Sequence, residues 1–96
     1  MIDISPAHFK MVKHILNIHV PNYEVWAFGS RVTGTAKPYS DLDLVIITET
    51  PLPILDTAKL ALDFSESDLP FKVDVLDWAS LSKEFKKIIQ NQYEVF

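Results

Sequence analysis

The 96-residue sequence contains no cysteine, and this absence excludes several classes of chemistry at once. Without thiols the chain cannot form disulfides, bind zinc through thiolates or use a cysteine nucleophile. Its first six residues lack the basic end and apolar run of a signal peptide, and no apolar stretch approaches the length that spans a bilayer. The sequence therefore predicts a soluble, cytoplasmic protein without a membrane segment.

Basic residues are scarce, because 9 Lys and Arg stand against 13 Asp and Glu and give a formal net charge of -4. Broad affinity for nucleic acids depends on clustered basic side chains that neutralise backbone phosphates. A nucleic acid is thus unlikely as an acceptor. The 48% hydrophobic content nevertheless supplies enough apolar surface for a folded chain. We expect a single domain over residues 1–96.

Apolar patterns and breaking residues predict an alternation of helices and strands. Strands are expected at residues 23–28, 41–47 and 72–77. Helices are expected at residues 6–18, for one turn after Ser30, at residues 54–66, and after a cap at Ser80 or Ser82. Ser5 is the expected N-cap of the first helix, with Pro6 at its first position. The expected fold class is α/β (α+β), with a small mixed β-sheet of three or more strands and helices packed on it.

The two later helices each carry an apolar stripe. In the helix over residues 54–66 the stripe consists of Leu55, Ala58, Ala61, Leu62 and Phe64. In the last helix the expected buried face consists of Leu81, Phe85, Ile88 and Ile89.

A phosphate-binding turn is predicted at Gly29 and Ser30, where the first strand runs into a short helix. Such a junction offers free backbone N–H groups and the positive end of a helix to an anion. Gly29 lets the backbone approach a phosphate closely, and the Ser30 hydroxyl and Arg31 guanidinium could add donors. Taken alone, however, Gly-Ser at a strand end is more often an ordinary turn.

Asp41 and Asp43 lie two residues apart at the start of the second strand, so their side chains share one face. Carboxylates about 6–7 Å apart along a strand can chelate one hard cation or hold a pair of cations roughly 4 Å apart. Magnesium is the expected ion, because it prefers oxygen ligands. The alternative is that Asp41 ends a loop and Asp43 lies on a solvated face.

Asp74 lies between two β-branched residues, Val73 and Val75, in a strand that should be at least half buried. A buried carboxylate is costly unless it is paired or bound to metal, which favours a place beside Asp41 and Asp43. Lys72 shares the face of Asp74 but is left out of the site, since a strand-edge lysine is usually solvated. Strand parity puts Asp77 on the opposite face, where we expect it to end the strand.

The combination of Gly29-Ser30, Asp41-x-Asp43 and Asp74 resembles the DNA polymerase beta-like nucleotidyltransferase superfamily. Residues 28–34 and 40–44 are similar to the minimal nucleotidyltransferases (MNT), the type paired with HEPN proteins, and the resemblance covers residues 25–77. It implies a catalytic and metal-binding set of Asp41, Asp43 and Asp74. It also implies a nucleotide-binding set of Gly29, Ser30 and Arg31.

The resemblance implies a metal-dependent enzyme that transfers a nucleoside monophosphate, AMP from ATP, to a hydroxyl acceptor. One or two Mg²⁺ ions would be the cofactor. The implied acceptor is a tyrosine of a HEPN-type partner, with this chain as the antitoxin of a toxin–antitoxin pair. The apolar content also suggests that a partner or another copy covers part of the surface, in a hetero-oligomer or homo-oligomer.

Three other functions compete with this interpretation. The first is a non-catalytic antitoxin module that binds nucleotide and partner without transfer. The second is a phosphatase or phosphotransferase with an aspartate nucleophile. It is disfavoured because in those enzymes the apolar strand precedes the aspartates, whereas here residues 44–47 follow them. The third, a Walker-type phosphate loop, is excluded because neither Lys-Ser nor Lys-Thr follows Gly34.

Overall fold

The computed structural model describes residues 1–96. The elements are α1 (Pro6–His19), β1 (Val25–Phe28), α2 (Ser30–Thr33), β2 (Leu42–Ile46), α3 (Ile54–Ser65), β3 (Val73–Asp77), the 3-10 helix η1 (Trp78–Ser80), α4 (Lys83–Asn91) and β4 (Glu94–Val95). The predicted order of helices and strands is confirmed. Two short elements, η1 and β4, were not predicted because they are too brief to produce a periodic pattern.

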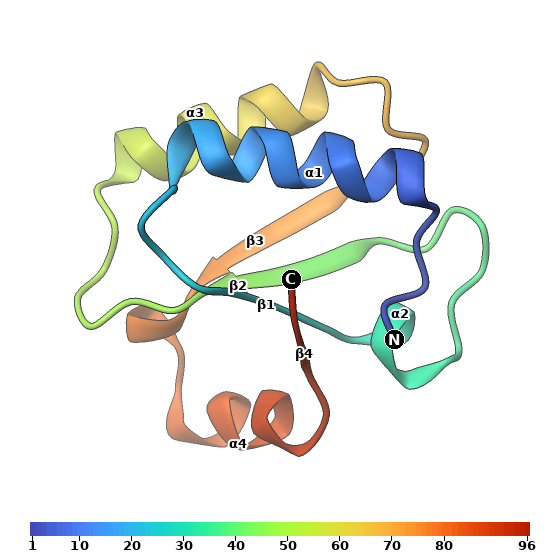
Figure 1. Ribbon diagram of the computed structural model, residues 1–96. Helices are drawn as coiled ribbons and strands as arrows, with labels where there is room; N and C mark the ends of the chain where they lie inside the picture. Colours follow the sequence, from blue (N-terminus) through green and yellow to red (C-terminus); the bar gives the residue numbers. More distant parts are fainter.

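A four-stranded mixed sheet of order β3-β2-β1-β4 forms the centre of the fold. β1 runs antiparallel to both β2 and β4, whereas β2 and β3 are parallel. Helices α1 and α3 cover one face of this sheet, and α4 lies on the other (Figure 1). The mixed sheet predicted from the sequence is confirmed, and β3 forms one of its two edges.

Local capping interactions begin two of the helices where the sequence predicts. The Ser5 hydroxyl accepts a hydrogen bond from the backbone N–H of His8 at 3.2 Å, and Pro6 occupies the first helical position. Ser82 caps α4 in the same way, by accepting from Phe85 N–H at 3.1 Å. This bond decides between the two predicted caps in favour of Ser82.

The core lies between β2 and the helix pair α1 and α3. Leu42, Leu44 and Ile46 of β2 are completely buried, and they join a cluster that includes Val12 of α1 and Leu60 of α3. Alternation along β2 directs its other residues toward the face of α4. The sheet therefore has one side devoted to packing and a second side on which polar groups can be placed.

The buried face of α3 differs from the predicted stripe. Leu60 and Phe64 are its buried residues, whereas Leu55 and Leu62 are 71% and 58% exposed. The helix is apolar on two adjacent faces, and only one of them can face α1 and the sheet. A periodicity argument cannot choose between two such faces, so the predicted stripe is largely wrong.

The predicted buried face of α4 is also only partly correct. Ile89 is completely buried, but Phe85 is 37% and Ile88 is 66% exposed. α4 lies on the side of the sheet opposite the helix pair α1 and α3 (Figure 1). No helix in the structure combines the length and apolarity needed to cross a bilayer.

Candidate active site

Asp43 and Asp74 lie directly opposite each other across the parallel pair β2 and β3. Residues opposite each other in a sheet point to the same face, so both carboxylates project from the side of α4. Asp41 precedes β2 by one residue and is exposed. The topology thus gathers three carboxylates at one end of the sheet, although Asp74 lies 33 residues after Asp41 in the chain.

The electrostatics of this group centre on Asp43. Burial raises the pKa of Asp43 above its ordinary value of 3.8, and the neighbouring negative charges of Asp74 and Asp41 raise it further. Burial and like charge both disfavour the ionised carboxylate. A cation placed among the three side chains would relieve both effects.

Gly29 brings the predicted phosphate turn against these carboxylates. Its φ of +79° lies in the left-handed region, and a Cβ at this position would collide with the Oδ2 atom of Asp43. The preceding residue, Phe28, is the cross-strand partner of Asp43. Glycine is therefore required here for two reasons, the backbone conformation and the close approach of a carboxylate.

Ser30 opens α2 immediately after Gly29. The cap residue Gly29 has no side chain to bond the first turn, and its carbonyl accepts from Val32 and Thr33 N–H, each at 3.0 Å. The N–H groups of Ser30 and Arg31 precede these and have no acceptor within the helix. The Ser30 hydroxyl makes no hydrogen bond to another group of the chain, while the Ser30 carbonyl accepts from Gly34 and Thr35 N–H, each at 3.2 Å. Polar donors thus lie beside the carboxylates, as the sequence predicts.

Arg31 does not point toward this site, contrary to the sequence prediction. Its guanidinium donates to the carbonyl oxygens of Asp3 (2.8 Å), Pro38 (3.1 Å) and Ser40 (2.8 and 3.0 Å). Its Cζ atom also lies 4.2 Å from the ring centroid of Phe71, and the residue is only 5% exposed. These donors are occupied by backbone, so the predicted phosphate contact of Arg31 is wrong.

The hydrogen bonds of Arg31 instead organise the loop between α2 and β2. Two of them hold the carbonyl of Ser40, the residue that precedes Asp41. Ser40 is also fixed through its hydroxyl, which accepts from Lys37 N–H at 2.8 Å. Arg31 is therefore a positioning residue for the loop that delivers Asp41 to the carboxylate group.

Lys72 contacts a carboxylate of the site, although it was not predicted to be part of it. Its Nζ lies 3.2 Å from Oδ1 of Asp74. The hydrogen bond to Asp74, followed by the charges of Asp74 and Asp41, raises the pKa of Lys72. Strand parity, which puts Lys72 and Asp74 on one face, was the signal that could have identified it.

The donor set fits a hard divalent cation. Three carboxylates supply only oxygen, the ligand type that Mg²⁺ prefers. As the side chains stand, no three acidic or histidine groups enclose a metal position, and Lys72 is the cation that contacts Asp74. Metal binding at this place would therefore need small side-chain rotations at Asp41 and Asp74.

Asp77 has the structural role that the sequence predicts. It ends β3, accepts hydrogen bonds from Ala79 N–H (3.1 Å) and Leu52 N–H (2.6 Å), and contacts the hydroxyl of Thr48. These bonds tie the loop after β2 to the end of β3. Asp77 stands apart from the three carboxylates of the candidate site.

Comparisons with known proteins agree with this geometry. A family model described as the nucleotidyltransferase domain matches residues 9–95. The chain is 55% identical over 94 residues to a Haemophilus influenzae protein named "Probable protein adenylyltransferase MntA", covering 98% of this chain and 82% of that protein.

Solved structures share the fold. A toxin–antitoxin structure with AMP-PNP aligns with a TM-score of 0.75 at 24% identity, over 90% of this chain and 69% of that one. A structure of a tri-AMPylated Shewanella oneidensis HEPN toxin in complex with an MNT antitoxin aligns with a TM-score of 0.67 at 23% identity, over 90% and 66% of the two chains. The chain belongs to the nucleotidyltransferase domain family, in which it is a minimal nucleotidyltransferase homologous to MntA.

Proposed function

We propose that this chain transfers AMP from ATP to a hydroxyl group of a HEPN-type partner protein, as the antitoxin of a toxin–antitoxin pair. The observation that carries the proposal is the pairing of Asp43 with Asp74 beside the Gly29 turn. The 55% identity to a protein named as an adenylyltransferase supports AMP as the transferred group. The structural relatives, described with AMP-PNP or with an AMPylated HEPN toxin, support the donor and the partner.

In this proposal Asp41, Asp43 and Asp74 form the catalytic and metal-binding set. They would hold one or two Mg²⁺ ions, which when bound supply neutralising charge to the triphosphate. The backbone N–H groups after Gly29 and the Ser30 hydroxyl would bind triphosphate oxygens, because they lie at a helix start beside the carboxylates. Arg31 contributes indirectly, through the loop that carries Asp41.

The reaction forms one phosphorus–oxygen bond and breaks another. The acceptor hydroxyl oxygen attacks the α-phosphorus in line, and the bond from that phosphorus to the bridging oxygen of pyrophosphate breaks. The hydroxyl proton passes to the Asp74 carboxylate, which is 39% exposed and so accessible to an acceptor. The leaving pyrophosphate takes its negative charge with it, stabilised by the N–H groups at Gly29 and Ser30.

The predicted single domain and cytoplasmic location belong to the same proposal. Residues 1–96 supply every group assigned above. A partner protein rather than nucleic acid as acceptor agrees with the net charge of -4.

Labelling with [α-³²P]ATP tests the proposal. The wild-type chain, Mg²⁺ and a HEPN-type partner should yield labelled partner, and EDTA should abolish the label. Asp41→Asn and Asp43→Asn should each reduce labelling by roughly 10²-fold or more, since each removes a charged ligand from the site. Asp56→Asn, at an exposed position on α3 distant from the carboxylates, is the matched control.

Two results would contradict transfer as described. In one, the partner remains unlabelled although it binds the chain; this result would instead indicate a non-catalytic binding module. In the other, Asp41→Asn and Asp43→Asn label the partner as fast as Asp56→Asn does. Circular dichroism of each variant separates lost chemistry from lost folding.

A further inference from the structure

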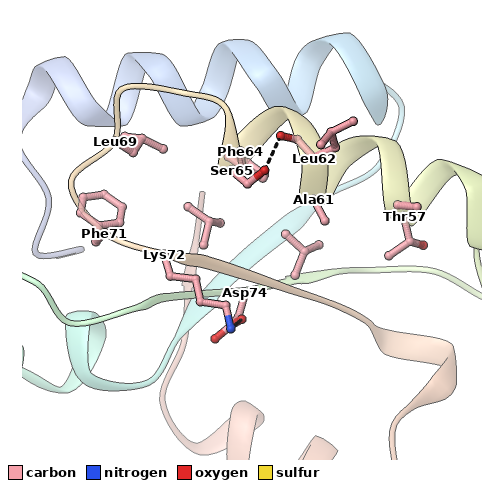
Figure 2. A pocket seen from close by; sticks show the side chains of 12 residues that line it. Thr57, Ala61, Leu62, Phe64, Ser65, Leu69, Phe71, Lys72 and Asp74 are labelled. Carbon is pink, nitrogen blue, oxygen red and sulfur yellow. Dashed lines mark hydrogen bonds and ion pairs between the residues drawn. The ribbon is translucent and has the colours of Figure 1, made fainter.

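A groove of about 780 Å³ runs between α3 and the edge strand β3. Its walls include Ala61 and Leu62 of α3, and Val73 and Val75 of β3. Lys72 and Asp74 also border it, but their side chains point away from α3, to the other side of the strand (Figure 2). Leu62 is 58% exposed, and Ala61 beside it is exposed as well. An apolar groove thus lies on one face of β3, and a carboxylate of the candidate active site lies on the other face of the same strand.

The backbone beside this groove is available for pairing. β3 is an edge strand, and its residue pairs with β2 occupy only one side. The Lys72 carbonyl accepts from Leu42 N–H at 2.9 Å, so the backbone polar groups of Lys72 face β2. Alternation then turns the N–H and C=O groups of Val73 and Val75 toward the free edge.

A strand added at this edge would contact two different surfaces with alternate side chains. One set would lie on the face of Val73 and Val75, which is the α3 groove. The other set would lie on the face of Asp74, and a side chain directly opposite Asp74 would have its Cβ about 5 Å away. The edge therefore fits an extended segment with a hydroxyl side chain between two apolar ones.

We propose that the acceptor segment of the HEPN-type partner binds as an extended strand along β3, with apolar side chains in the α3 groove and its acceptor hydroxyl at Asp74. This inference rests on the proposed function, and it names the part of the chain that recognises the acceptor. Main-chain pairing supplies affinity in such recognition, and side-chain pockets supply sequence preference. Because the groove and Asp74 lie on the same edge strand, a segment paired with β3 would reach both, and this distinguishes it from a partner segment that docks without reacting.

Lys72 has a defined part in this arrangement. It is 72% exposed at the free edge, and a lysine at an edge discourages pairing between sheets of unrelated molecules. Its contact with Asp74 at 3.2 Å covers the place where the acceptor hydroxyl would lie. An incoming segment would displace this side chain, which is long and exposed enough to turn into solvent.

Leu62→Lys and Leu55→Lys form a matched pair for the test. Both positions are exposed leucines on α3, but only Leu62 lines the groove. We expect Leu62→Lys to lower kcat/KM for labelling of the HEPN-type partner about tenfold or more, because the lysine would lose hydration in the occupied groove. Ala61→Lys should act in the same way, whereas Leu55→Lys should match wild type.

Two further measurements accompany the labelling rates. The affinity for Mg²⁺ and AMP-PNP should be unchanged in all three variants, since none of them touches Gly29 or the carboxylates. The affinity for the HEPN-type partner, measured by biolayer interferometry with AMP-PNP present, should fall for Leu62→Lys and Ala61→Lys alone.

The outcomes separate the two proposals. If wild type labels the partner and Leu62→Lys and Ala61→Lys label it equally fast, the groove assignment is wrong and the transfer proposal stands. If wild type does not label the partner, transfer is wrong, and partner affinity decides the groove. If wild type and both groove variants then bind the partner equally well, or if none of them binds it, the groove assignment is wrong.

Discussion

At the scale of the residue, Asp43 carries charge in an unfavourable place. Burial, then Asp74 and Asp41, raise its pKa above the ordinary value of 3.8. The folded state therefore holds the Asp43 proton more tightly than the unfolded state does. Above the pKa that Asp43 has in the folded state, its ionised carboxylate destabilises the metal-free protein. This loss of stability disappears as the pH falls from that pKa toward 3.8, the ordinary value.

Asp43→Asn should accordingly stabilise the metal-free protein at pH 7. We expect the Tm in EDTA to rise by about 2–4 °C, a shift that corresponds to less than about 1 kcal/mol in a domain of this length. The difference from wild type should shrink as the pH is lowered toward 3.8. Stabilisation of wild type by Mg²⁺ should be lost in the variant, because metal binding requires the charged carboxylate.

Differential scanning calorimetry with and without Mg²⁺ measures both effects. Asp68→Asn, at an exposed position outside the helices and strands, is the control and should leave the Tm nearly unchanged in EDTA. A Tm for Asp43→Asn that lies below wild type in EDTA at pH 7 would show that Asp43 makes a favourable contact in the metal-free fold, against the expectation.

At the scale of the element, the loop between α2 and β2 depends on a single side chain. Arg31 donates to three backbone carbonyls, and these come from the N-terminal segment and from both Pro38 and Ser40 of the loop. A planar guanidinium can make such divergent bonds, whereas a lysine ammonium is a compact point charge on a flexible stem. The conformation of the loop before Asp41 is thus a consequence of guanidinium geometry.

Arg31→Lys should destabilise the protein and weaken metal binding together. We expect a loss of about 2–3 kcal/mol in urea unfolding, because a buried guanidinium that bonds three backbone carbonyls is replaced by a group that cannot make all of these bonds. The Mg²⁺ concentration needed for half-maximal AMP-PNP binding should rise, because the loop no longer fixes Asp41. Lys37→Arg, an exchange of the same two residue types in the same loop at an exposed position, should change neither quantity.

A direct phosphate contact of Arg31 would give a different pattern. In that case Arg31→Lys would weaken AMP-PNP binding with little change in unfolding, because the lysine charge still attracts phosphate. The two measurements together therefore distinguish positioning from contact.

At the scale of the whole molecule, α3 connects the core and the proposed acceptor surface. Leu60 is completely buried in the cluster formed with β2 and α1, and Leu62 is 58% exposed in the groove beside β3. Two residues along one helix thus serve opposite purposes. The exposed apolar face is a stability cost that a partner-binding surface would explain.

Leu60→Ala and Leu62→Ala should therefore separate stability from recognition. Removing the buried Leu60 side chain leaves a cavity and should reduce the free energy of unfolding by about 2–5 kcal/mol, a large part of the about 5–15 kcal/mol typical of a domain. Leu62→Ala should change it by less than about 0.5 kcal/mol. Urea titration followed by tryptophan fluorescence measures both, and equal losses would mean that Leu62 also packs in the core.

Local bond geometry accounts for what the sequence determined by itself. The cap at Ser5, the helix and strand order, and the shared face of Asp41 and Asp43 all depend on residues a few positions apart. Periods of 3.6 and 2 residues are properties of any helix and strand, so they can be read without knowing the partner elements. The predicted fold class was confirmed for this reason.

Only the tertiary structure decided the features that depend on which elements meet. The parallel register of β2 and β3 puts Asp74 opposite Asp43, and a shift by one residue would send Asp74 to the α3 side. The inward direction of Arg31 follows from carbonyls that long loops bring together. The choice between the two apolar faces of α3 depends on the layer packed above it, because burial is a relation between elements and not a property of one segment.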